Sequence, residues 1–151
     1  MDSKTTLIFL CLFASCIHEQ TDAEFNIYGD SCKIWLLYDE RFMPIVLCFG
    51  EDDYQDYKIK NNGRLVKRDS FVYSEQVFRG GKWVIKNKCL VLNGYQTPIQ
   101  SLLTDTIKLG RNEFLLNVSN KFYINNCNCQ TLDATFKGGK IDSIKTILQY
   151  K

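Results

Sequence analysis

The sequence predicts a mainly β fold, a β-rich α+β domain in which antiparallel hairpins form a small sandwich or barrel with one short helix. Short apolar runs rich in β-branched and aromatic residues alternate with turn dipeptides such as Gly80-Gly81 and Asn93-Gly94. Five cysteines follow residue 23, which predicts a domain stapled by disulfides. The sequence has no internal repeat or linker, so its 151 residues predict one domain.

Residues 1–23 have the features of a signal peptide. Lys4 gives a short positive region, and residues 7–14 form an apolar block that is too short to span a bilayer. Thr21-Asp22-Ala23 fits the small residues of a cleavage site. We therefore expect a single secreted, extracellular domain over residues 24–151.

A second interpretation of the same leader is a bacterial lipoprotein signal, in which Cys16 becomes the lipid-anchored first residue. No other segment is long and apolar enough to predict a membrane-spanning helix. Both interpretations place the chain outside the cytoplasm, and a nucleic-acid partner is not expected there.

The cysteines that follow the leader predict a disulfide framework rather than a metal site. Their number is odd, so one is left over or joins two chains into a dimer, and the sequence leaves the connectivity open. Two of them, at i and i+2 in a strand, would face the same side and so reach different partners. The candidates are Cys32, Cys48, Cys89, Cys127 and Cys129.

The first strands are expected at residues 32–38 and 45–49, where Pro44 opens the second and the two form a hairpin. The acidic cluster of residues 51–53, with Asp56 nearby, lacks the ligand spacing and glycine of a calcium loop, so we expect a solvated loop. Residues 56–68 predict the next hairpin, with Asn61-Asn62-Gly63 as its loop and Ile59 opposite Leu65.

This hairpin carries a basic strip that is the candidate contact surface. The register places on one face the side chains of Lys58, Lys60, Arg64 and Arg68. The chain has a formal net charge of +2, and removal of the leader takes away one lysine and three acids. This mildly basic balance allows binding to sulfated glycans or other anionic surfaces.

Residues 70–86 predict a hairpin around Gly80-Gly81, with Phe78 opposite Trp83, Val77 opposite Val84 and Glu75 opposite Lys86. The polar residues 86–88 predict a bulge or tight turn, after which Cys89 would be a structural staple. Thr97-Pro98-Ile99-Gln100 resembles a helix start, and three apolar residues then follow helical spacing. These are Ile99, Leu102 and Leu103, so one short helix is expected after Asn93-Gly94.

Strands are expected next at residues 106–109, 113–118 and 121–124. Asn117-Val118-Ser119 is an acceptor for N-glycosylation, which predicts a surface position for Asn117. Gly138-Gly139 predicts a last hairpin with Phe136 opposite Ile141, whereas residues 144–148 fit a terminal helix equally well.

Several kinds of chemistry are missing from the sequence. The only histidine, His18, lies in the leader, so the mature chain has no Ser-His-Asp or Cys-His nucleophile and no histidine-rich zinc site. It also has no glycine-rich phosphate loop after a strand. We therefore expect no enzyme, no cofactor and no metal.

The function that fits is recognition outside the cell. We expect a secreted binding protein, acting as an effector, an immune-modulating protein or a signalling protein through contact with an extracellular protein or an anionic glycan. The alternatives are a small-ligand carrier with a lipocalin-like barrel, which the aromatic content and successive hairpins suit, and a secreted protease inhibitor.

Overall fold

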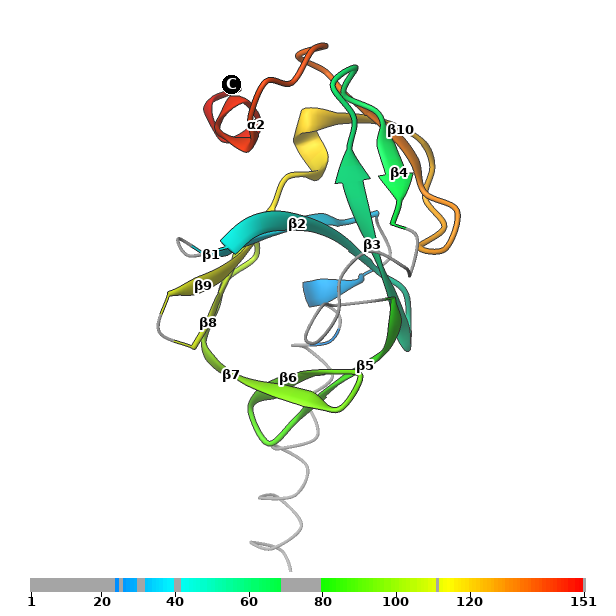
Figure 1. Ribbon diagram of the computed structural model, residues 1–151. Helices are drawn as coiled ribbons and strands as arrows, with labels where there is room; N and C mark the ends of the chain where they lie inside the picture. The colour runs from blue at the N-terminus through cyan, green and yellow to red at the C-terminus, as the bar shows by residue number, and fades with distance from the viewer. Residues whose placement is uncertain are drawn as a thin grey trace, which may run out of the picture.

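The computed structural model describes residues 24, 26–29, 32–39, 42–68, 80–110 and 112–150. It confirms a mainly antiparallel β fold with one short helix near the C-terminus (Figure 1). The strands are β1 (Ile34–Asp39), β2 (Phe42–Phe49), β3 (Asp53–Ile59), β4 (Leu65–Lys67), β5 (Gly81–Lys86), β6 (Cys89–Leu92), β7 (Tyr95–Leu102), β8 (Thr106–Leu109), β9 (Glu113–Asn117), β10 (Phe122–Asn126) and β11 (Asp133–Phe136). A 3₁₀ turn, η1 (Ser119–Lys121), precedes β10, and the helix is α2 (Ile144–Gln149).

Eight of these strands close into a barrel, which decides between the sandwich and the barrel. Their order is β2-β1-β9-β8-β7-β6-β5-β3, and β3 pairs back with β2 to complete the ring (Figure 1). Neighbouring strands are antiparallel throughout. A closed ring leaves no unpaired edge in the barrel wall.

The barrel interior is filled by one face of each strand, because alternate side chains of a strand point to opposite sides. Trp35 and Leu37 point inward from β1 and share this core with Ile27. The described N-terminal segment, blue in Figure 1, lies inside the ring. The Trp35 indole Nε1 donates to the Ile27 carbonyl oxygen at 2.8 Å, which fixes that segment. The other buried residues of this core are Leu47, Phe49, Tyr54, Trp83, Ile85, Leu90, Leu92, Ile107, Leu109 and Leu115.

A second core lies outside the barrel, between the outer face of β1–β3 and a layer made of β4, β10, β11 and α2. Ile34 and Leu36 point outward from β1 into it, so both faces of this strand are buried. The further buried members are Val46, Cys48, Tyr57, Leu65, Val118, Phe122, Cys129, Leu132, Ala134, Phe136, Ile141 and Ile147. The disulfide Cys32–Cys127 joins the start of β1 to this layer.

Most of the predicted turns are confirmed. β1 and β2 form the first hairpin, and β3 and β4 pair with Ile59 opposite Leu65 around the Asn61–Gly63 loop. Asn87 and Lys88 both have positive φ and form a two-residue turn between β5 and β6, which settles the bulge-or-turn alternative. The strands predicted around residues 106–109 and 113–118 are β8 and β9.

The predicted helix at residues 97–103 is wrong. Asn93 (φ 50°) and Gly94 (φ 85°) form a tight turn, and the residues that follow are the strand β7, which pairs with β6. Pro98 lies opposite Cys89, and the next amide, that of Ile99, donates to the Lys88 carbonyl at 2.8 Å. A bulge between Ile99 and Ser101 brings Ile99 and Leu102 to the same side, which imitates the spacing of a helix.

The predicted hairpin around Gly138-Gly139 is also wrong. Phe136 belongs to β11 and pairs with Phe122 of β10, while the Ile141 amide donates to the Asn61 carbonyl at 3.0 Å. The alternative of a terminal helix is correct, because α2 covers residues 144–149. The Lys121 ammonium donates to the Tyr150 carbonyl and ties the end of this helix to η1.

The partners proposed for β5 across Gly80-Gly81 cannot be placed. Glu75, Val77 and Phe78 lie outside the described residues. Within them, β5 pairs with β6 on one side and, through Gly81 and Lys82, with β3 on the other. Among the residues that the structure describes, no helix has the length and apolar character needed to cross a membrane.

Candidate anion-binding groove

A groove opens where β4 and β11 separate on the outer layer. Arg64, the residue before β4, forms an isolated antiparallel bridge with Thr135 of β11, and the groove lies between β4 and residues 130–133, which precede Thr135. The space between them has a volume of about 440 Å³. Its lining residues are Tyr57, Lys60, Arg64, Leu65, Val66, Lys67, Gln130, Thr131, Leu132 and Asp133.

Tyr57 holds the floor of the groove together. Its hydroxyl donates to the Cys129 carbonyl at 2.8 Å and accepts the Leu132 amide at 3.0 Å. Burial is the main cause that raises the pKa of Tyr57 to about 12, so the hydroxyl stays protonated at physiological pH. Leu65 and Leu132 complete a buried, apolar floor beside it.

The walls of the groove carry three basic side chains and one acid. The Lys67 ammonium donates to Gln130 Oε1 at 3.1 Å, and Arg64 Nε lies 3.9 Å from Asp133 Oδ1. The Arg64 and Asp133 side chains are 62% and 43% exposed, so solvent weakens this ion pair. Lys60 is exposed as well, and the lining therefore has an excess of two positive charges, three minus one.

The tip of the β3–β4 hairpin is fixed against the C-terminal part of the chain. Gly63 is buried with a φ of 81°, and its carbonyl accepts the Phe136 amide at 2.9 Å. A Cβ added there would lie 2.6 Å from the Gly139 carbonyl oxygen, so only glycine fits without displacement of backbone. This contact sets the positions of Lys60 and Arg64, which flank the loop.

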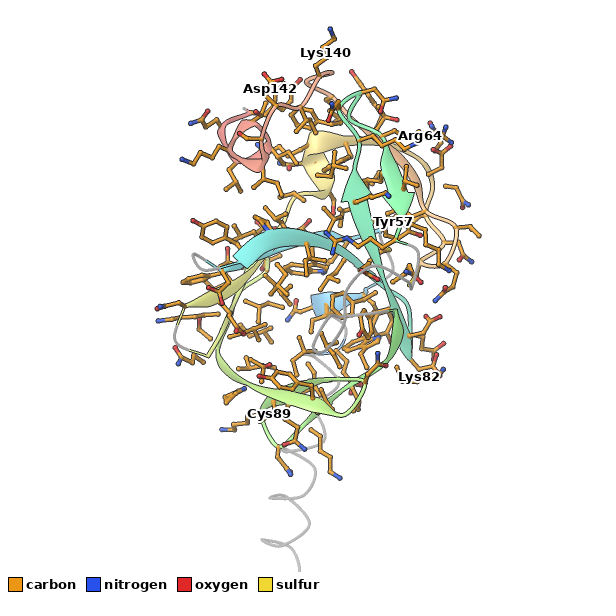
Figure 2. All side chains as sticks on the ribbon, viewed as in Figure 1. Tyr57, Arg64, Lys82, Cys89, Lys140 and Asp142 are labelled. Carbon is orange, nitrogen blue, oxygen red and sulfur yellow. A yellow bond between two sulfur atoms is a disulfide. The ribbon has the colours of Figure 1, made fainter. Side chains whose placement is uncertain are left out.

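The structure brings together part of the predicted basic strip. Lys60 and Arg64 line the groove, and Arg64 lies on the outer layer in Figure 2. Lys58 is exposed opposite Val66 and is not a lining residue, and Arg68 is half-buried beside the barrel. Lys67 is not part of the predicted strip, but it lines the groove on β4, where its ammonium contacts Gln130. Only the tertiary contact with residues 130–133 reveals its role.

The carboxylate of Asp56 is buried on β3, between the residues of that strand that pair with β4 and those that pair with β5. Asp56 pairs with Leu47, whose side chain fills the barrel. The expectation of a solvated acidic loop therefore holds for the exposed Glu51 and Asp52 but is wrong for Asp56, and also for Asp53, which is half-buried at the start of β3. The Gly80 amide donates to Asp56 Oδ1 at 3.2 Å. Burial raises the pKa of Asp56, against smaller opposing contributions from backbone amides and the Arg68 guanidinium.

Tyr54 lies two residues before Asp56 on β3 and belongs to the core inside the barrel. Its hydroxyl accepts a hydrogen bond from Asn93 Nδ2 at 3.1 Å. Burial, and then the Asp56 charge, raise the pKa of Tyr54 to about 12. These two side chains place polar groups on the inward face of β3.

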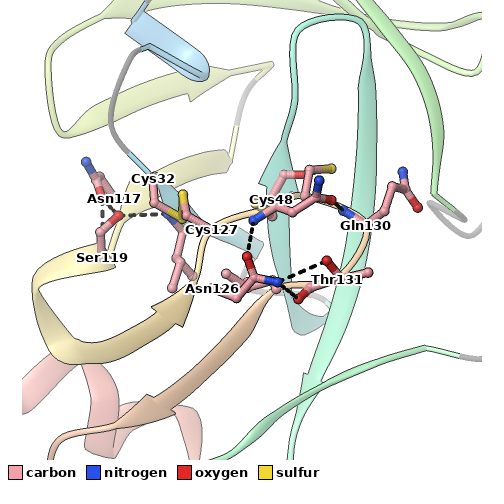
Figure 3. The surroundings of a disulfide bond; sticks show 12 residues. Cys32, Cys48, Asn117, Ser119, Asn126, Cys127, Gln130 and Thr131 are labelled. Carbon is pink, nitrogen blue, oxygen red and sulfur yellow. Dashed lines mark hydrogen bonds between the residues drawn. A yellow bond between two sulfur atoms is a disulfide. The ribbon is translucent and has the colours of Figure 1, made fainter.

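The five cysteines of the described residues fall into one bonded pair and three thiols. Figure 3 shows the Cys32–Cys127 disulfide and, on the neighbouring segment of the barrel, Cys48. Cys48 and Cys129 are buried, whereas Cys89 is half-buried on the outer side of β6, so it is the cysteine left for the predicted link between two chains. In the described part of the chain, no cluster of three or more histidine, cysteine or acidic residues could hold a metal ion.

Asn117 ends β9 as a half-buried residue of the glycosylation motif. Its Oδ1 accepts hydrogen bonds from the Ser119 amide at 3.0 Å and the Ser119 hydroxyl at 2.6 Å (Figure 3). The Ile34 amide in turn donates to the Ser119 hydroxyl at 2.7 Å. Occupancy of this site stays a prediction.

Comparison of the chain with protein families, with curated proteins and with solved structures gave no match.

Proposed function

We propose that this is a secreted binding protein that recognises an anionic glycan outside the cell through the groove beside β4. The observation that carries the proposal is the basic lining of a preformed groove above the fixed Tyr57 floor. Long, exposed cations around an apolar floor suit sulfate groups carried on sugar rings. An effector, immune-modulating or signalling role would follow from that binding.

The groove favours a glycan over a protein surface. Stable protein interfaces have an apolar, well-packed centre with aromatic anchors. The exposed large hydrophobic residues of the described ranges do not line the groove. They are Val84, Tyr95, Leu103, Tyr123 and Leu148, and they are scattered over five elements or turns.

Heparin-affinity chromatography of groove variants tests the proposal. The combined variant Lys60→Gln, Arg64→Gln and Lys67→Gln should elute at much lower salt. Exposed charge pairs contribute roughly 0.5–1 kcal/mol each, so three should lower the affinity about 10- to 100-fold.

A matched variant removes the same number of charges elsewhere. Lys86, Lys88 and Lys145 are exposed and lie on the β5–β6 turn and on α2, outside the groove. Their combined replacement by Gln should change retention much less, as should Lys58→Gln on the same hairpin as the groove. Equal losses in the groove variant and the matched variant would mean that the attraction comes from net charge alone, and the proposal would be abandoned.

A small-ligand carrier is the second candidate function, and the closed ring of eight strands favours it. Barrels of this size hold either a side-chain core or one small ligand. Native mass spectrometry of protein purified without denaturation distinguishes the two functions. A retained small molecule that is lost on unfolding supports a carrier, and a bare protein mass that binds heparin oligosaccharides supports the groove.

A further inference from the structure

Two of the three thiols in the described part of the chain, Cys48 and Cys129, are neighbours in the second core. Cys48 lies on β2 and points outward from the barrel, and Cys129 lies in the segment between β10 and β11. The Cys129 thiol donates a hydrogen bond to the Cys48 carbonyl oxygen at 3.1 Å, so the two residues are direct neighbours. Only 2% of Cys48 and 8% of Cys129 is exposed. Cys89, by contrast, is on the far side of the barrel (Figure 2).

We propose that Cys48 and Cys129 form a second disulfide, parallel to Cys32–Cys127. The two thiols lose two protons and two electrons to a small-molecule disulfide such as oxidised glutathione, whose S–S bond breaks to give two thiols. The new bond holds the two sulfur atoms about 2.05 Å apart. Because both cysteines are buried in the folded chain, the exchange takes place during folding, before the outer layer closes.

The position of the pair explains the Cys-x-Cys spacing. Cys127 and Cys129 would each join the outer layer to the barrel, the first at the start of β1 and the second near the end of β2. The Cys129 carbonyl also accepts the Tyr57 hydroxyl at 2.8 Å. The bond would thus fix the segment that contacts the floor of the groove. The importance of this for binding rests on the proposed function, whereas the proposal of the bond does not rest on it.

Tryptic mapping tests the bond directly. The full chain is refolded in a mixture of reduced and oxidised glutathione, alkylated in denaturant without reductant, and digested. Trypsin releases Cys48 in the peptide 42–58 and leaves Cys127 and Cys129 together in the peptide 122–137. We expect these two peptides to be covalently joined until a reductant separates them, with the Cys32 peptide joined to the same fragment.

Two variants identify the cysteine on the 122–137 fragment. Cys127→Ala should leave the link to peptide 42–58 intact, and Cys129→Ala should release that peptide with an alkylated Cys48. The Cys32–Cys127 link in the unsubstituted chain reports correct folding. An alkylated Cys48 in a chain that holds this link overturns the proposal, as does a Cys48 joined to the Cys89 peptide, and either result leaves the glycan proposal standing.

Discussion

Replacing Tyr57 with phenylalanine removes one oxygen atom from the contact between the barrel and the outer layer. That hydroxyl is bonded to the Cys129 carbonyl and the Leu132 amide, both of which belong to buried residues. Each buried backbone group left without its partner costs about 1–3 kcal/mol. We therefore expect Tyr57→Phe to lower the free energy of unfolding by about 2–6 kcal/mol, the sum for the two groups, with no further loss from packing because the ring still fills the second core.

Urea unfolding, followed by tryptophan fluorescence, measures this loss. Tyr123→Phe is the matched control, because the Tyr123 ring is 62% exposed on β10 and its substitution should change stability by less than about 0.5 kcal/mol. The slope of the transition should be the same in all three proteins if each unfolds in two states. A Tyr57→Phe protein as stable as the Tyr123→Phe control would refute the role of this hydroxyl.

The remaining predictions concern a charge, a covalent bond and a modification. Burial raises the pKa of Asp56 in the folded chain, so the folded chain binds this proton more tightly than the unfolded chain. The free energy of unfolding of the wild type should therefore fall, relative to that of Asp56→Asn, as the pH rises from about 4 towards the raised folded pKa. Urea unfolding at several pH values measures both proteins, and parallel curves of free energy against pH would contradict this. Replacing both Cys32 and Cys127 with serine should lower the free energy of unfolding by about 4–5 kcal/mol, because the disulfide closes a loop with a sequence separation of 95. An unchanged midpoint of urea unfolding would be incompatible with this. Protein secreted from a glycosylating cell should lose mass on treatment with an amidase that removes N-glycans, and Asn117→Gln should abolish this shift.

The sequence predicts the local parts of the fold well. Hairpin registers follow from a few turn residues, because a turn type with positive φ determines which residues face each other. Asn61-Asn62-Gly63 correctly places Ile59 opposite Leu65 in this way. The failure at residues 97–103 has the same local origin, since a bulge between Ile99 and Ser101 gives a strand the apolar spacing of a helix.

The long-range parts of the fold could not be predicted. Closure of the ring depends on pairs such as Trp35 with Asn117, and hairpin patterns contain no information about it. The groove forms because β4 and residues 130–133 lie side by side, and the hairpin pattern contains no information about this contact. The predicted basic strip therefore lacks Lys67, which lines the groove, and contains Lys58, which does not. The sequence correctly predicts that Cys127 and Cys129 do not pair with each other, but the parity argument is wrong, because both lie after the end of β10 and only Cys129 is buried. The packing of the outer layer shows that their neighbours are Cys32 and Cys48.

The most direct test of the central claim is the location of a bound sulfated oligosaccharide. Amide NMR spectra of the labelled protein, recorded as a short heparin fragment is added, report each backbone position separately. We expect saturable shifts centred on Lys60, Arg64, Lys67 and Gln130, which surround the groove. Saturable shifts centred instead on Lys86 and Lys88, at the β5–β6 turn, would contradict the claim, and so would the absence of any saturable shift.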